Sequence, residues 1–141
     1  DGMTDEQAGM RSTVSALCLG GIVKHVGDVE AAWTAFIAGG ADAMDAEAAR
    51  QDREASFAMQ PGDTVAGVLA HYEQIAAATD QLVGGLSDLD AAHPLPSAPW
   101  FEAGASWSAR RVVVHILGET AHHAGHADII RESIDGAKTM G

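Results

Sequence analysis

The sequence predicts an all-α protein, a bundle of long helices joined by long crossover connections. Apolar residues recur at spacings of three and four in three long stretches, as expected of helices that bury one face. No stretch alternates apolar and polar residues over more than a few positions, and no internal repeat is present. The length of 141 residues is typical of one domain, so we expect residues 1–141 to form a single helical domain.

The first long helix is predicted from about Ser15, a good N-cap residue, to Ile37. Gly39 and Gly40 follow directly and are expected to end it. Two further glycines, Gly20 and Gly21, weaken its first turns by about 1 kcal/mol each relative to alanine. Close approach of a neighbouring helix would explain why glycine occupies these positions. The apolar stripe consists of Leu19, Ile22, Val23, Val26, Val29, Trp33, Phe36 and Ile37.

The middle of the chain contains a crossover, a second helix and a proline-rich loop. Residues 38–62 combine alanines with charged residues and lack an apolar stripe, so we predict a surface crossover containing at most a short helical turn. Asp63 is the predicted N-cap of a helix that ends near Leu86. Residues 92–100 contain three prolines, which exclude a helix and predict a long, stiff loop.

The last helix is predicted to begin near Ser106 or Ser108 and to end near Asp135, before Gly136. Its first turn carries Arg110 and Arg111, which we expect to contact the acidic crossover at residues 42–54. The three tryptophans, Trp33, Trp100 and Trp107, are expected to be packing anchors, and His71 and His93 are expected at the surface.

The densest polar cluster lies inside this last helix, at residues 119–126. At 100° per residue, Glu119 and His123 fall into the apolar stripe, whereas His126 lies at its margin and His115 and His122 lie on its flank. A carboxylate and an imidazole that face the core are unfavourable unless they pair with each other or bind a metal. These residues alone leave both explanations open.

His25 lies beside the apolar stripe of the first helix and adds a third ligand candidate. If the two helices face each other, His25, Glu119 and His123 converge, and three such ligands with one open position are typical of catalytic zinc. Metal sites in helical bundles are built in this way from facing helices. The alternative is a metal-free helical dimer with a buried Glu–His network.

The charge and cysteine content exclude several classes of function. Eight basic and 20 acidic residues give a net charge of -12, which disfavours nucleic acids and anionic membrane surfaces as partners. The chain has no apolar run of membrane-spanning length and no N-terminal signal pattern. The single cysteine, Cys18, excludes an internal disulfide and falls in the core stripe of its helix. We therefore expect a cytoplasmic protein.

Five segments also carry a family resemblance: residues 4–8, 19–26, 61–65, 107–115 and 119–132. Through these segments, nearly the whole chain resembles the DinB/YfiT-like metalloprotein superfamily. It is most similar to the actinobacterial branch of mycothiol-dependent S-transferases and mini-circle proteins. The resemblance implies a four-helix bundle that forms a homodimer. It also implies a helix before residue 4, which this sequence does not contain, so that either the sequence is truncated or the bundle is completed differently, for example by a partner chain.

The resemblance further implies a divalent metal, zinc or nickel, held by three ligands. In the family one ligand is a histidine on the second helix, which falls on His25 here, and the His-x-Gly step at residues 123–125 places the other two at Glu119 and His123. His126 is then a fourth ligand or a neighbour of the ligands. The implied activity is transfer of a low-molecular-weight thiol, mycothiol, to an electrophilic substrate in detoxification. Two alternatives remain open: a non-catalytic metal-binding stress-response protein, and a mycothiol-dependent isomerase, because the His-Glu-His set resembles the maleylpyruvate isomerases.

Overall fold

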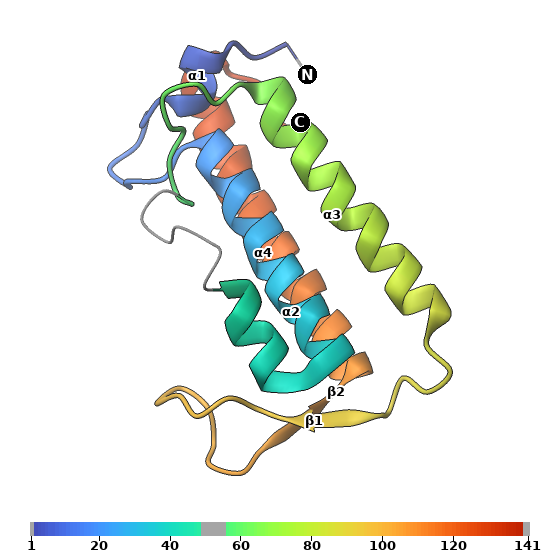
Figure 1. Ribbon diagram of the computed structural model, residues 1–141. Helices are drawn as coiled ribbons and strands as arrows, with labels where there is room; N and C mark the ends of the chain where they lie inside the picture. The colour runs from blue at the N-terminus through green and yellow to red at the C-terminus, as the bar shows by residue number, and fades with distance from the viewer. Residues whose placement is uncertain (1, 49–55, 140–141) are drawn as a thin grey trace.

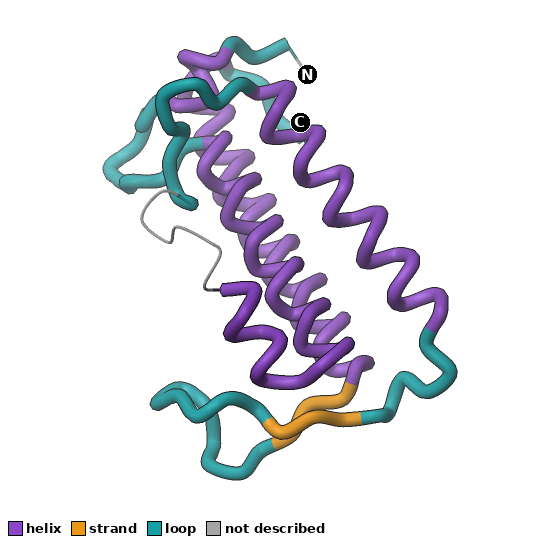
Figure 2. The backbone as a smooth tube through the Cα atoms, viewed as in Figure 1, coloured by secondary structure: helices purple, strands orange, loops and turns teal. Residues whose placement is uncertain are grey.

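The computed structural model describes residues 2–48 and 56–139 and consists of packed helices with one small hairpin (Figures 1 and 2). The three longest helices run alongside one another; the shortest caps one end, and the hairpin lies at the other (Figure 1). The predicted helical bundle is therefore confirmed. In chain order the elements are α1 (Asp5–Gly9), α2 (Leu19–Ala48), α3 (Val65–Gly85), β1 (Ala92–Pro94), β2 (Ser106–Ser108) and α4 (Ala109–Asp135).

Helix α2 begins later and extends further than the sequence predicts. It starts at Leu19, not at Ser15, and its helical geometry is interrupted at Gly40, where φ is 75° and ψ is -160°. The predicted stop is thus a sharp turn, which a residue without a side chain makes at little cost. The chain then resumes a helix up to Ala48, which folds back beside the first part of α2 (Figure 1). The prediction of at most a short turn here was wrong for residues 41–48, and residues 49–55 lie outside the described part.

Helix α3 begins at Val65, and its N-cap is Thr64, whose hydroxyl accepts a hydrogen bond from the Gly67 amide at 3.0 Å. Asp63 was predicted for this role but serves another. Its carboxylate accepts from the Gln60 amide at 2.8 Å and from Lys24 Nζ at 2.7 Å. Both hydrogen bonds lower the pKa of Asp63, and the one from the Gln60 amide has the larger effect. Asp63 therefore ties the start of α3 to α2.

Strands β1 and β2 form an antiparallel pair in which His93 lies opposite Trp107. The prediction of a loop was wrong for residues 92–94, and the last helix begins after Ser108 and not near Ser106. Three residues per strand are too few to show an alternating pattern. His93 is half-buried, not at the surface, and packs edge-on against Phe36. Arg110 donates to Asp90 at 2.9 Å, before the hairpin, and not to the crossover as predicted.

Helix α4 has the predicted ends. Ser108 is the N-cap, accepting from the Arg111 amide at 3.2 Å, and Gly136 adopts the left-handed conformation that stops the helix. Trp107, just before the helix, stacks on Trp33 and is covered by the Arg111 guanidinium at 4.2 Å.

Helices α2 and α4 share the buried core, which consists of two clusters. One surrounds Trp33, Phe36 and Val112, and the other contains Ile22, Val26 and Ile130. Along α4 the two clusters are separated by a polar stretch that includes Glu119 and His123, whereas on α2 His25 lies between Ile22 and Val26, at the level of the second cluster. By contrast, no residue of α3 is buried. No described helix combines the length and the apolar character that crossing a membrane requires.

The glycine pair at the start of α2 faces a loop segment and not a neighbouring helix. A Cβ at Gly21 would overlap the backbone carbonyl of Phe57, and a Cβ at Gly20 would overlap the side chain of Met59. Cys18, just before the helix, is fully buried as predicted, with Sγ 3.8 Å from the Phe57 carbonyl oxygen. The glycines therefore allow residues 56–59 to lie directly on α2, next to His25.

Candidate metal centre and adjoining cavity

His25 on α2 comes together with Glu119 and His123 on α4, beside the cluster of Ile22, Val26 and Ile130. Each offers one ligand atom, and these three atoms all lie within 4.8 Å of one another. The rings of His25 and His123 are 4.9 Å apart, centroid to centroid, and meet edge to face. The structure thus brings together the three residues that the sequence singled out, although His25 is more than 90 positions away from the other two in the chain.

The local structure explains how each side chain is positioned. Glu119 and His123 are one turn apart on α4 and therefore share a face of the helix. His123 is 9% exposed, as expected in the apolar stripe, whereas Glu119 is half-buried. His25 is held by the ring of Phe57, which stacks on it at a centroid distance of 4.1 Å. The close packing of residues 56–59 on α2 thus fixes one of the three ligand candidates.

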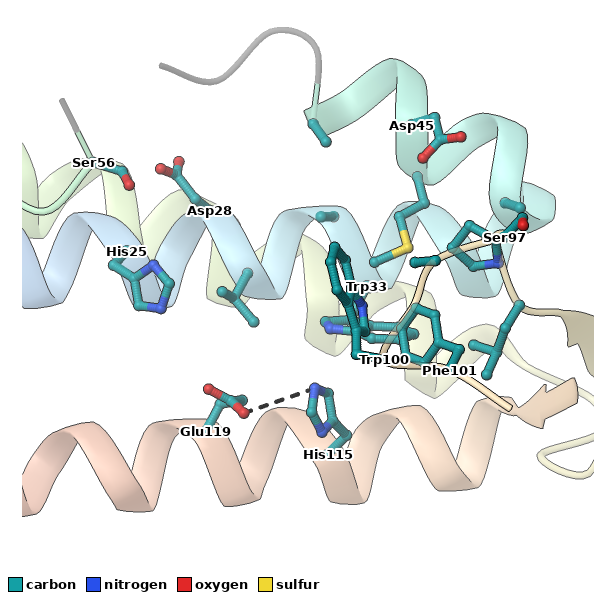
Figure 3. Close-up of a pocket in the computed structure, with 18 of the residues that line it drawn as sticks. His25, Asp28, Trp33, Asp45, Ser56, Ser97, Trp100, Phe101, His115 and Glu119 are labelled. Carbon is teal, nitrogen blue, oxygen red and sulfur yellow. Dashed lines mark ion pairs between the residues drawn. The ribbon is translucent and has the colours of Figure 1, made fainter. Parts of the chain in front are cut away.

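Glu119 lies between two imidazoles. One carboxylate oxygen is 3.8 Å from His123 Nε2, and the other is 3.9 Å from His115 Nε2 (the dashed line in Figure 3). His115 is half-buried and packs edge-on against the rings of Trp33 and Trp107. Sequence reasoning placed His115 on the flank and gave it no role. Its position one turn before Glu119 is the signal that could have connected it with the site.

Three histidines around Glu119 favour the neutral form. Burial is the main cause that lowers the pKa of His25, His115 and His123 below the usual value of 6.5. For His25 the proximity of His123 acts in the same direction, and the Glu119 carboxylate opposes it. Because a neutral imidazole has a free lone pair on one nitrogen, these residues are ready to bind a metal ion near neutral pH.

His126 lies beside this group but outside it. Its Nδ1 is 3.5 Å from Nδ1 of His123, whereas Nε2 of His123 faces Glu119. Its assignment as a fourth ligand remains a prediction.

A cavity of about 950 Å³ adjoins the candidate metal centre. His25 and Glu119 line one part of it, and Trp33, Trp100 and Phe101 line another, near the hairpin (Figure 3). Trp100 is 72% exposed, so its prediction as a packing anchor was wrong, whereas Trp33 is buried as predicted. The cavity therefore joins a part lined by His25 and Glu119 to an aromatic part near the hairpin.

The fold and this site define a class of protein, a helical bundle with a candidate His–Glu–His metal centre beside a cavity. Comparison with protein families makes the assignment more specific. The family model for mycothiol-S-transferase matches residues 1–136, so the chain belongs to this DinB/YfiT-like family, as the resemblance implied. Comparisons with curated proteins and with solved structures found no match.

Proposed function

We propose that this protein is a metal-dependent S-transferase that joins mycothiol to an electrophilic substrate in detoxification. Membership of the mycothiol-S-transferase family supports the transferase activity and mycothiol as the thiol. The observation that carries the mechanism is the position of His25 and Glu119, which belong to the candidate metal group and also line the cavity.

The donor set fits a borderline divalent ion. Two imidazoles and one carboxylate are typical ligands of catalytic zinc, with a fourth position left to a water molecule or substrate, and imidazole also suits nickel. We propose zinc as the metal and His25, Glu119 and His123 as its ligands. When bound there, zinc would supply the positive charge that converts a neighbouring thiol into its thiolate, the competent nucleophile.

The protein's own residues bind and orient the two substrates. Because His25 and Glu119 face the cavity, a thiol that enters it reaches the ligand group directly. Trp33, Trp100 and Phe101 offer aromatic surfaces on which an apolar electrophile can pack. In the reaction the thiolate sulfur forms a bond to the electrophilic carbon, the leaving group departs with the electron pair of its own bond, and the thiol proton passes to solvent.

Cys18 is not suited to act as the nucleophile. Its side chain is 1% exposed, and its Sγ contacts a backbone carbonyl behind the segment that covers α2. A thiol this deeply buried is out of reach of a substrate and behaves as a small hydrophobic residue. The attacking sulfur must therefore come from the substrate.

A conjugation assay tests the proposal. Zinc-loaded protein is mixed with mycothiol and monobromobimane, and formation of the fluorescent conjugate is followed. We expect a rate above the uncatalysed reaction that disappears when zinc is removed and in the His123→Ala variant. His71→Ala, which removes an exposed histidine of α3, should retain the rate. Failure to exceed the background with several electrophiles would contradict the proposal and favour a non-catalytic metal-binding protein.

A further inference from the structure

A second pair of histidines lies on α4, beside the candidate metal centre but outside it. His122 and His126 are one helical turn apart, and their ring centroids are 4.5 Å from each other. His122 is exposed and His126 is half-buried. Neither residue belongs to the group of His25, Glu119 and His123, and neither lines the cavity. The proposed S-transferase reaction leaves both of them without a role.

This spacing suits the chelation of one metal ion. Histidines at positions i and i+4 of a helix project from the same face and can bind one ion through a nitrogen of each ring. Two imidazoles favour borderline ions, and among these copper(II) binds most strongly. The exposure of His122 leaves the other coordination positions accessible to water or to a small ligand.

The orientation of His123 separates this pair from the metal centre. Nε2 of His123 faces Glu119, at 3.8 Å from a carboxylate oxygen. Nδ1 of the same ring is 3.5 Å from Nδ1 of His126. The two sides of one imidazole thus face two different groups, and a metal bound on the Nε2 side leaves Nε2 of His126 and the ring of His122 free for a second ion.

We propose that His122 and His126 form a second, solvent-facing binding site for a borderline transition-metal ion such as copper(II) or nickel(II). The site adjoins the centre formed by His25, Glu119 and His123 but has its own ligands. The proposal depends only on the position of the two imidazoles on α4 and not on the S-transferase activity.

Copper(II) binding to the metal-free full-length protein tests it. The number of ions bound per chain is measured by equilibrium dialysis, and the nitrogen ligands are detected by electron paramagnetic resonance. We expect two equivalents in the unmodified protein and one in His122→Ala and in His126→Ala, with loss of the same spectral component in both. His71→Ala, which removes an exposed histidine of α3, should bind two. Alanine has high helix propensity, so circular dichroism should show intact helices in all variants.

Three outcomes would overturn the proposal. The first is a single equivalent in the unmodified protein. The second is a second equivalent that survives His122→Ala. In the third, His126→Ala loses the copper(II) ion that binds more tightly, while His122→Ala binds as many ions as the unmodified protein. That result would make His126 a ligand of the neighbouring centre.

Discussion

Glu119 is the residue on which the geometry of the centre depends most. Its two oxygens lie 3.8 Å from a nitrogen of His123 and 3.9 Å from a nitrogen of His115, so it connects a ligand candidate to an imidazole that is packed among tryptophans. It is also the only carboxylate in the group of His25, Glu119 and His123. A carboxylate in this position offsets part of the charge of a divalent ion.

We predict that Glu119→Gln weakens zinc binding by at least about 100-fold, because an amide has the shape of a carboxylate but not its charge. Competition with a chromogenic chelator measures the affinity. Glu132→Gln is the matched control, since Glu132 lies on the same helix but pairs with Lys138 at the surface. Equal affinities of the two variants would show that Glu119 is not a ligand.

The pH dependence of stability follows from the histidines. The pKa values of His25, His115 and His123 are lowered in the folded protein, so the unfolded chain binds more protons than the folded one as the pH falls below 6.5. Proton binding therefore favours the unfolded chain at low pH. The free energy of unfolding is highest above pH 6.5 and decreases as the pH falls from 6.5 through the lower pKa values of the folded protein.

We therefore predict that the melting temperature of the metal-free protein falls between about pH 7.5 and about pH 5.5, a range above most carboxylate titrations. His115→Gln should reduce this fall, because it removes one of the three imidazoles. Thermal denaturation followed by circular dichroism provides the measurement. A melting temperature that does not change over this range would refute the assignment of neutral, buried histidines.

At the residue scale, helical periodicity was sufficient to select Glu119 and His123 but not their surroundings. A helical wheel shows on which face of a helix a residue lies, and the face that it gave for His123 is buried in the structure. It does not give the rotation of facing helices or the position of a loop, so the contact between His115 and Glu119 and the stacking of Phe57 on His25 were not predicted. Both depend on tertiary packing.

At the scale of elements, the start of α2 depends on two glycines that allow residues 56–59 to lie on it. A methyl group at Gly21 would overlap the carbonyl of Phe57, which belongs to the backbone and has little freedom to move. At Gly20 the obstacle is the flexible side chain of Met59. Gly118 in α4 has open space around it.

We predict that Gly21→Ala destabilises the protein by about 1–3 kcal/mol, because overpacking outweighs the gain in helix propensity. Gly118→Ala should instead stabilise it by about 0.5–1 kcal/mol, because it gains propensity without a clash. Chemical denaturation of both variants measures the free energies of unfolding. A stabilising Gly21→Ala would contradict the close approach of residue 57, and the loss of order at Phe57 should also weaken metal binding through His25.

The elements differ in how much of their structure the sequence encodes locally. Helix α4 has an N-cap serine, a long apolar stripe and a terminal glycine, and both of its ends were predicted. The hairpin has three residues per strand and was not predicted. Its pairing places His93 against Phe36 and near Gly40, so it is stabilised by contacts with α2 that are distant in sequence.

At the scale of the whole molecule, the candidate centre joins α2 to α4, beside the apolar cluster of Ile22, Val26 and Ile130. A metal held by His25 on one helix and by Glu119 and His123 on the other would act as a cross-link that only the folded chain can form. We predict that zinc at about 100 times its dissociation constant raises the melting temperature by roughly 10 °C.

The variants His25→Ala and His123→Ala should both abolish this rise although they lie on different helices, whereas His71→Ala should retain it. Differential scanning calorimetry with and without zinc measures the rise in melting temperature for each variant. A rise that survives either of the first two variants would mean that the metal binds elsewhere.

The assembly state is a separate prediction at this scale. Helix α4 exposes Val114, Leu117 and Ile129, and α3 buries no residue. We expect a homodimer, with twice the 14.5 kDa of one chain, in light scattering coupled to size-exclusion chromatography. A mass of one chain at micromolar concentrations would refute this.

The sequence predicted the class of fold because three periodic helices define it, but a partner surface has no comparable local signal.

The central claim is that His25, Glu119 and His123 bind one and the same metal ion. A crystal structure of the zinc-loaded protein, with anomalous scattering measured on both sides of the zinc edge, tests it most directly. We predict one strong anomalous peak between α2 and α4, about 2.0–2.2 Å from a nitrogen of each histidine and from a carboxylate oxygen of Glu119. A zinc peak elsewhere, with these three side chains in contact only with one another, would contradict the account.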